Sequence, residues 1–141
     1  MQRVVLDTNI LISGLRSSAG SSFAVLRLVA EKRIRPLATT SLFLEYESVL
    51  TRPEQIASHG LSMSEVNSLM AEFAALTEPV EVHFLWRPML ADPKDEMVLE
   101  AAVNGRADAL ITHNMRDFAS VQDRFNLDIL RPADFLQRAR K

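Results

Sequence analysis

Four acidic side chains that lie far apart in the chain could together carry out metal-dependent chemistry: Asp7, Glu45, Asp95 and Asp117. Asp7 follows the apolar run at residues 4–6, and a carboxylate at the carboxyl end of such a strand lies where α/β folds build their sites. Carboxylates gathered at one point repel one another unless a cation lies among them. Hard cations such as Mg²⁺ or Mn²⁺ take oxygen ligands, so the sequence favours metal-dependent phosphodiester chemistry.

The segments that must position these acids alternate between short apolar runs and helical patterns, which is typical of a βαβ parallel sheet. We expect strands at residues 3–6, 35–38, 109–112 and 127–130, and an extended piece at residues 80–84. We expect helices at residues 8–15, 23–31, 41–50, 62–76, 93–104 and 132–138. Asp7 and Asp117 would then follow two strands and Asp95 would begin a helix, so these acids would meet at the carboxyl edge of the sheet.

Local signals define the ends of several elements. Residues 62–65 form a capping-box pattern at the start of a helix. Asp92 before Pro93 predicts an N-cap with proline at the first helical position, and Gly105 suits the position just after the helix. Residues 23–31 are apolar nearly all round, which predicts a buried helix. Asp108, at the start of the strand that follows, is expected at the opposite edge of the sheet from the acids.

Composition narrows the class of protein. The chain has 141 residues, of which 48% are hydrophobic, so it is long enough for one globular domain with a proper core. The absence of cysteine excludes thiolate metal sites, disulfides and cysteine nucleophiles. Asp7 interrupts any signal-peptide pattern, and no apolar run approaches a membrane span, so we expect a soluble, cytoplasmic protein. The net charge of −2 argues mildly against tight, non-specific nucleic-acid binding.

Each candidate residue also has a structural explanation. Asp7 could be a helix N-cap. A role as a covalent phosphoacceptor would favour a second aspartate two residues later, and Asn9 occupies that position. Glu45 could lie on a solvated helix face, and Asp95 could serve only the helix dipole in a first turn. His113 could be a general base, but the three histidines of the chain lack any metal-ligand spacing.

Taken together, four segments resemble a PIN domain, and especially the VapC-like toxins of prokaryotic toxin–antitoxin pairs. They are VVLDTNILIS at residues 4–13, SLFLEYESVLTRP at 41–53, DPKDEMVLEAAVNGRADALITHNMRDF at 92–118 and ILRPADFL at 129–136. The resemblance extends over nearly the whole chain. It implies a three-layer α/β/α sandwich with a central parallel sheet, formed by residues 1–141 as a single nuclease domain.

The resemblance also implies metal-dependent ribonuclease activity. The expected catalytic and metal-binding residues, which would hold Mg²⁺ or Mn²⁺, are Asp7, Glu45, Asp95 and Asp117. Asn114 stands where many family members have an aspartate, and Asp117 supplies an acid three residues later. The expected substrate-binding residues are Thr8, Asn9, Thr112, Asn114 and Arg116. The implied partners are an RNA substrate, a small antitoxin protein and a second copy of the chain in a homodimer.

Three other functions are compatible with these residues. A housekeeping RNA-processing nuclease would use the same site without an antitoxin. A PIN-like domain that binds RNA or protein without cutting is favoured by Asn114 and by the acidic composition, and opposed by the intact Asp7, Glu45 and Asp95. An α/β phosphotransfer domain would use Asp7 as its phosphoacceptor.

Overall fold

The computed structural model describes residues 1–83, 90, 92–122 and 124–139. Within these residues the strands are β1 (Gln2–Leu6), β2 (Ile34–Ala38), β3 (Glu78–Pro79), β4 (Ala109–Ile111) and β5 (Ile129–Leu130). The helices are α1 (Thr8–Arg16), α2 (Ser21–Ala30), α3 (Thr40–Leu50), α4 (Pro53–His59), α5 (Met63–Leu76), α6 (Pro93–Asn104), α7 (Met115–Phe118) and α8 (Pro132–Ala139). In the described part of the chain, no helix is long and apolar enough to cross a membrane.

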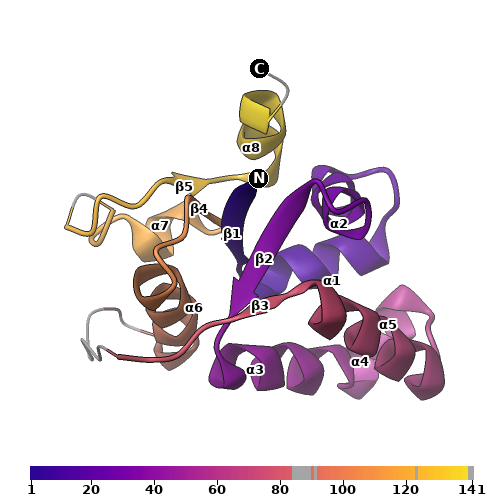
Figure 1. The fold of residues 1–141 in the computed structure, drawn as a ribbon. Coiled ribbons are helices and arrows are strands. Elements are labelled where there is room, and N and C mark those ends of the chain that lie inside the picture. Colours follow the sequence, from indigo (N-terminus) through magenta and orange to yellow (C-terminus); the bar gives the residue numbers. More distant parts are fainter. Residues whose placement is uncertain (84–89, 91, 123, 140–141) are drawn as a thin grey trace.

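The strands form one parallel sheet in the order β3-β2-β1-β4-β5. The last three residues of the central strand β1, Val4, Val5 and Leu6, are apolar and fully buried, as expected where helices cover both faces of a sheet. Figure 1 shows α1, α2 and α5 on one side of the strands and α6 and α7 on the other. The predicted α/β sandwich with a central parallel sheet is therefore confirmed.

The order of the strands creates the place for a site. From β1 the chain moves outward to β2 and β3, and it then returns to add β4 and β5 on the other side of β1. Leu6 at the end of β1 pairs with Ile111 at the end of β4. The direction of winding thus reverses between β1 and β4, and ligands of open α/β sheets bind at the carboxyl ends of strands at such a point.

A buried tyrosine ties α3 to the central strand. The hydroxyl of Tyr46 donates a hydrogen bond to the backbone carbonyl of Leu6, the residue before Asp7. The ring packs edge-on against Phe43 and Phe73, with ring centroids 6.2 and 5.9 Å away. Because Tyr46 is fixed in this way, its neighbour Glu45 on the same helix is held at the carboxyl edge of the sheet.

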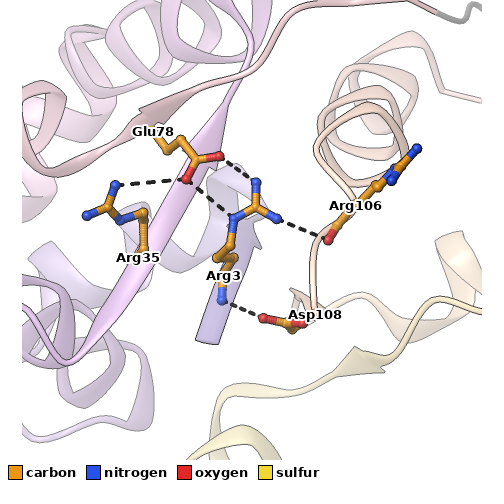
Figure 2. A network of polar contacts seen from close by, with 5 residues as sticks. All are labelled: Arg3, Arg35, Glu78, Arg106 and Asp108. Carbon is orange, nitrogen blue, oxygen red and sulfur yellow. Dashed lines mark hydrogen bonds and ion pairs between the residues drawn. The ribbon is translucent and has the colours of Figure 1, made fainter. Parts of the chain in front are cut away.

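At the opposite edge of the sheet, an arginine network joins three strands, as Figure 2 shows. Arg3 on β1 forms a bidentate contact with Glu78 on β3, across β2, and Arg35 lies 3.9 Å from the same carboxylate. The hydrogen bond and charge of Arg3 lower the pKa of Glu78. Asp108 accepts a 2.8 Å hydrogen bond from the backbone N–H of Arg3. This confirms that Asp108 lies at the edge opposite the candidate acids.

Most predicted elements are present, but the strand predicted at residues 127–130 is limited to β5 (Ile129–Leu130), and the short helix α7 was not among the predicted helices. Three further differences concern β3, α4 and α2. The extended piece predicted at residues 80–84 is instead β3 at Glu78–Pro79, and residue 84 lies outside the described residues. Helix α4 was not predicted: Pro53 ends the preceding segment but also serves as the first residue of α4. In helix α2 the buried residues are Ser22, Val25 and Val29, which lie along one face. The expectation of a helix buried all round was therefore wrong.

The capping signals are confirmed, and they differ in one detail from expectation. Ser62 and Glu65 form the complete capping box. The predicted helix at residues 41–50 begins at Thr40, because the Thr39 side chain accepts a hydrogen bond from the Leu42 N–H. Asp92 caps α6 through the N–H of Lys94 at 2.9 Å. These caps satisfy backbone donors that a helix start otherwise leaves without partners.

Gly105 is required for close packing and not for a left-handed backbone. Its φ is −84°, and the left-handed residue is the next one, Arg106, at φ 52°. A Cβ at Gly105 would lie 2.8 Å from the Ala101 carbonyl oxygen, 2.9 Å from Val80 and 3.0 Å from Leu37. The helix end therefore lies too close to its neighbours to admit a side chain.

We expect Gly105→Ala to lower the free energy of unfolding by about 1–3 kcal/mol, because the backbone oxygen of Ala101 cannot move aside cheaply. Urea unfolding followed by circular dichroism measures this change. Gly20→Ala is the matched control, since its φ is −87° and an added Cβ would meet nothing within 4 Å among the described residues. Equal stabilities of the two variants would contradict the packing explanation.

Candidate active site

Asp7 lies at the switch point, at the end of β1, and is only 7% exposed. It occupies the N-cap position of α1, yet within the described residues its side chain makes no capping hydrogen bond. Instead its Oδ2 accepts a 2.6 Å hydrogen bond from the hydroxyl of Thr112 and a longer one, 3.3 Å, from the amide of Asn9. The carboxylate is thus held toward β4, which argues against a role limited to helix capping.

The loop after β4 extends this hydrogen-bonding chain. Thr112 is fully buried, and its Oγ1 also accepts a 2.9 Å bond from the backbone N–H of Asn114. The backbone N–H of His113 donates to Oδ1 of Asn9 at 3.4 Å. The ring of His113 contacts the buried hydroxyl of Ser22 at 2.7 Å. In this arrangement Asn9 and Thr112 orient Asp7 and fix the start of the loop that carries Asn114 and Asp117.

Asp7, Asp95 and Asp117 share one electrostatic environment. Asp95 is the third residue of α6, and burial, followed by the charges of Asp7, Asp117 and Asp92, raises its pKa from 3.8 to about 6. Burial also raises the pKa of Asp7, with a further contribution from Asp117. Burial is the largest cause of both shifts, and neighbouring carboxylates add to it because like charges resist ionising together. Perturbed pKa values of this kind cluster at functional sites.

Glu45 adds a fourth acid beside the first turn of α6. Its side chain is 14% exposed, and its Oε1 is buried without a hydrogen-bond partner among the described residues. The ammonium of Lys94 lies 3.9 Å from this oxygen, which is close enough for an ion pair but too far for a hydrogen bond. A buried carboxylate oxygen left in this way is costly unless a ligand or ion satisfies it.

The remaining residues predicted to bind metal or substrate differ in their exposure to solvent. Thr8 is half-buried at the first position of α1. Asn114, Arg116 and Asp117 are exposed on and before α7. Hydrogen bonds through Thr112 therefore link Asp7 to the backbone of Asn114. The charges of Asp7 and Asp117 act on Asp95, and Glu45 is linked to α6 through its ion pair with Lys94.

The donor set suits a hard divalent cation. It consists of carboxylate oxygens, one of which is a buried atom without a hydrogen bond. Within the described residues, no three acidic or histidine side chains lie close enough together to coordinate one ion as they stand. The described side chains therefore do not form a closed coordination shell, although the charges of Asp7 and Asp117 reach Asp95. Mg²⁺ and Mn²⁺ both accept such sets, because each keeps several water ligands.

Two contacts of the site were not identified from the sequence. Ser22, which holds the His113 ring, lies in a serine-rich segment with no distinguishing pattern. Tyr46 could have been found, because it is the single tyrosine of the chain and shares a helix face with the buried Leu42, Val49 and Leu50. A lone tyrosine on a core face usually needs a partner for its hydroxyl.

The raised pKa of Asp95 predicts a pH dependence of stability in EDTA. A carboxyl whose folded pKa exceeds its unfolded value costs stability as it ionises, so this cost grows as pH rises from about 4 to about 6. Asp95→Asn should remove it. Because Asp95 is partly solvated, we expect the stability difference between variant and wild type to grow by only about 1 kcal/mol between pH 4.5 and 7.

Urea unfolding of both proteins at the two pH values measures the difference. Asp134→Asn, on the exposed side of α8, controls for the loss of one carboxylate elsewhere on the surface. A difference between Asp95→Asn and wild type that does not change with pH would contradict the prediction.

Comparison with known proteins is consistent with this geometry. The family model described as PIN domain matches residues 3–116 of the chain. No curated protein matches. Among solved structures, a chain in the crystal structure of VapBC2 from Rickettsia felis, bound to a DNA fragment from their promoter, is similar with a TM-score of 0.58. The two chains are 15% identical, and the likeness covers 90% of this chain and 96% of that one. Because the family match spans most of the sequence, the protein belongs to the PIN-domain family.

Proposed function

We propose that this chain is a metal-dependent endoribonuclease that hydrolyses RNA phosphodiester bonds, with residues 1–141 acting as a single nuclease domain. The observation that carries the proposal is the set of acids at the switch point. Asp7 and Asp95 have raised pKa values, first through burial and then through neighbouring carboxylates, and Glu45 has a buried oxygen without a hydrogen bond among the described residues. Such a set is expensive to keep unless a cation uses it.

Asp7, Glu45, Asp95 and Asp117 would hold Mg²⁺ or Mn²⁺. When bound, such an ion makes a water molecule more acidic near neutral pH and polarises the scissile phosphate. Thr112 and Asn9 would keep the Asp7 carboxylate in one orientation, which lowers the cost of forming the site. The exposed Asn114 and Arg116, together with Thr8 at the start of α1, would contact the phosphate backbone. His113 is not needed as a base in this scheme, and its ring contacts Ser22.

The biological setting that we propose is a toxin–antitoxin pair. The resemblance of the sequence to VapC-like toxins supports this setting, and so does the likeness in fold to a chain of the VapBC2 complex. The partners would be the RNA substrate, a small antitoxin protein and a second copy of the chain in a homodimer. Acting on RNA, the protein would work in the cytoplasm.

A metal response in the melting temperature is an expected outcome. At a concentration of Mn²⁺ one hundred times its Kd, binding to the folded state alone adds about 2.7 kcal/mol of stability, which corresponds to a rise of about 8 °C. Differential scanning fluorimetry with Mn²⁺, with Mg²⁺ and with EDTA measures the rise. A monovalent salt at equal ionic strength is the control. A melting temperature that does not respond to saturating Mn²⁺ would contradict a formed metal site.

The activity itself is tested by incubating the purified protein with a mixed RNA pool. We expect cleavage with Mn²⁺ and none with EDTA. A protein that folds and binds metal but leaves the pool intact would indicate a narrow target or a copurified inhibitor, and single cellular RNA classes would then be tested in turn. A protein that neither cuts nor binds metal would favour the non-catalytic alternative.

A further inference from the structure

Lys94 forms an ion pair with Glu45, one of the residues proposed to bind the metal. Its ammonium lies 3.9 Å from Glu45 Oε1, and among the described residues it is the cation that pairs with one of the four proposed metal ligands. The Lys94 side chain is 55% exposed, whereas the Glu45 side chain is only 14% exposed. The glutamate is therefore held by the protein, while the lysine reaches it from solvent and can leave.

The position of Lys94 opposes the ordinary preference of a helix. It is the second residue of α6, after the Asp92 N-cap and Pro93, so its charge lies at the positive end of the helix dipole. Cations are disfavoured in a first turn, where acids are preferred. The surrounding carboxylates supply a reason for a lysine here, because Asp92, Asp95 and Glu96 follow or flank it and Asp7 and Asp117 act on the same region.

We propose that Lys94 is a built-in counter-cation that competes with the divalent metal for Glu45. This inference rests on the proposed function, since it assumes that Glu45 is a metal ligand. Without metal, the ammonium offsets the charge of Glu45 and partly satisfies its buried oxygen. A divalent ion bound to Glu45 repels the ammonium, and the long, exposed side chain then turns away toward solvent. Metal binding therefore has to displace Lys94.

The test is the affinity for Mn²⁺ of the full chain, measured by isothermal titration calorimetry or by the free Mn²⁺ signal in electron paramagnetic resonance. We expect Lys94→Met to bind Mn²⁺ about three- to tenfold more tightly than wild type, because exposed ion pairs are weak and only a modest competitor is removed. Lys94→Arg keeps the charge and should stay close to wild type. Lys32→Met, at an exposed position after α2, makes the same change in net charge and should leave the affinity unchanged.

A double-mutant cycle separates competition for Glu45 from simple charge repulsion. In a Glu45→Gln background, Lys94→Met should no longer tighten Mn²⁺ binding, because the residue for which the lysine competes is gone. In EDTA, Lys94→Met should lower the melting temperature more in the wild-type background than in Glu45→Gln, where only the other acids around the first turn of α6 remain near the lysine. This second readout does not depend on metal or on activity.

Three outcomes would overturn the inference: unchanged or weaker Mn²⁺ binding by Lys94→Met, an equal gain in the Glu45→Gln background, or an equal gain with Lys32→Met. Binding of Mn²⁺ by Lys94→Met when wild type binds none would support it strongly. If neither protein binds Mn²⁺, the proposed metal site itself fails, and the role of Lys94 fails with it. The failure of the inference alone is recognised by wild-type binding that Lys94→Met does not change.

Discussion

Asp7→Asn is expected to reduce Mn²⁺-dependent RNA cleavage by at least about 10³-fold, which corresponds to the loss of about 4 kcal/mol of transition-state stabilisation. The asparagine side chain has the same shape and retains one oxygen that can accept the hydrogen bond from Thr112. It lacks the negative charge with which Asp7 would attract and hold a divalent cation. Asp95→Asn should have a similar effect, because Asp95 faces the same region from the start of α6.

The fold should survive both substitutions. Burial and neighbouring acids raise the pKa values of Asp7 and Asp95, so removing either charge relieves a cost that the metal-free protein carries. Circular dichroism and melting in EDTA should therefore show a protein at least as stable as wild type. Asp134→Asn on α8, which changes the net charge equally, should keep full cleavage. Cleavage that persists in both Asp7→Asn and Asp95→Asn would remove these residues from the catalytic site.

The sequence was sufficient to predict the elements that position Asp7 and Asp95, because their signals are local. The fully buried strand before Asp7 is a continuous apolar run, and Asp92 with Pro93 marks the start of α6 without reference to the rest of the chain. The prediction was wrong where tertiary packing decides the outcome: α2 is apolar nearly all round but is buried along one face only. Gly105 lies directly after α6, as expected, but the close approach of Leu37 and Val80 that makes a glycine necessary there is a tertiary contact that local patterns do not show.

The contacts within the site could not be predicted from local patterns. Thr112 bonds Asp7 across 105 positions of sequence, and that contact depends on β4 adding next to β1 and not beyond β3. The order of strands is a property of the whole fold, and without the family resemblance several orders satisfy the same apolar runs. The ion pair of Lys94 with Glu45 depends likewise on how α3 lies against α6. Residue types were thus predictable, whereas their partners were not.

Glu45→Gln is expected to lower Mn²⁺-dependent cleavage by about 10²-fold and to weaken Mn²⁺ binding, an effect of about 2.7 kcal/mol on the reaction barrier. The loss should be smaller than for Asp7→Asn because Glu45 lies on a helix beside the sheet, whereas Asp7 is fixed by Thr112 at the strand end. The buried Oε1 of Glu45, which lacks a hydrogen bond among the described residues, is the physical reason to expect an effect at all.

The matched control for this prediction is Glu47→Gln, two residues further along α3. It removes the same charge from the same helix, but Glu47 does not belong to the proposed set of ligands. Cleavage rates and Mn²⁺ affinities of the two variants, measured side by side, separate a direct ligand from a general change in helix charge. If Glu45→Gln cleaves as fast as Glu47→Gln, Glu45 is not a ligand. Its unsatisfied oxygen would then serve only to anchor Lys94, and the metal site would rest on the three aspartates.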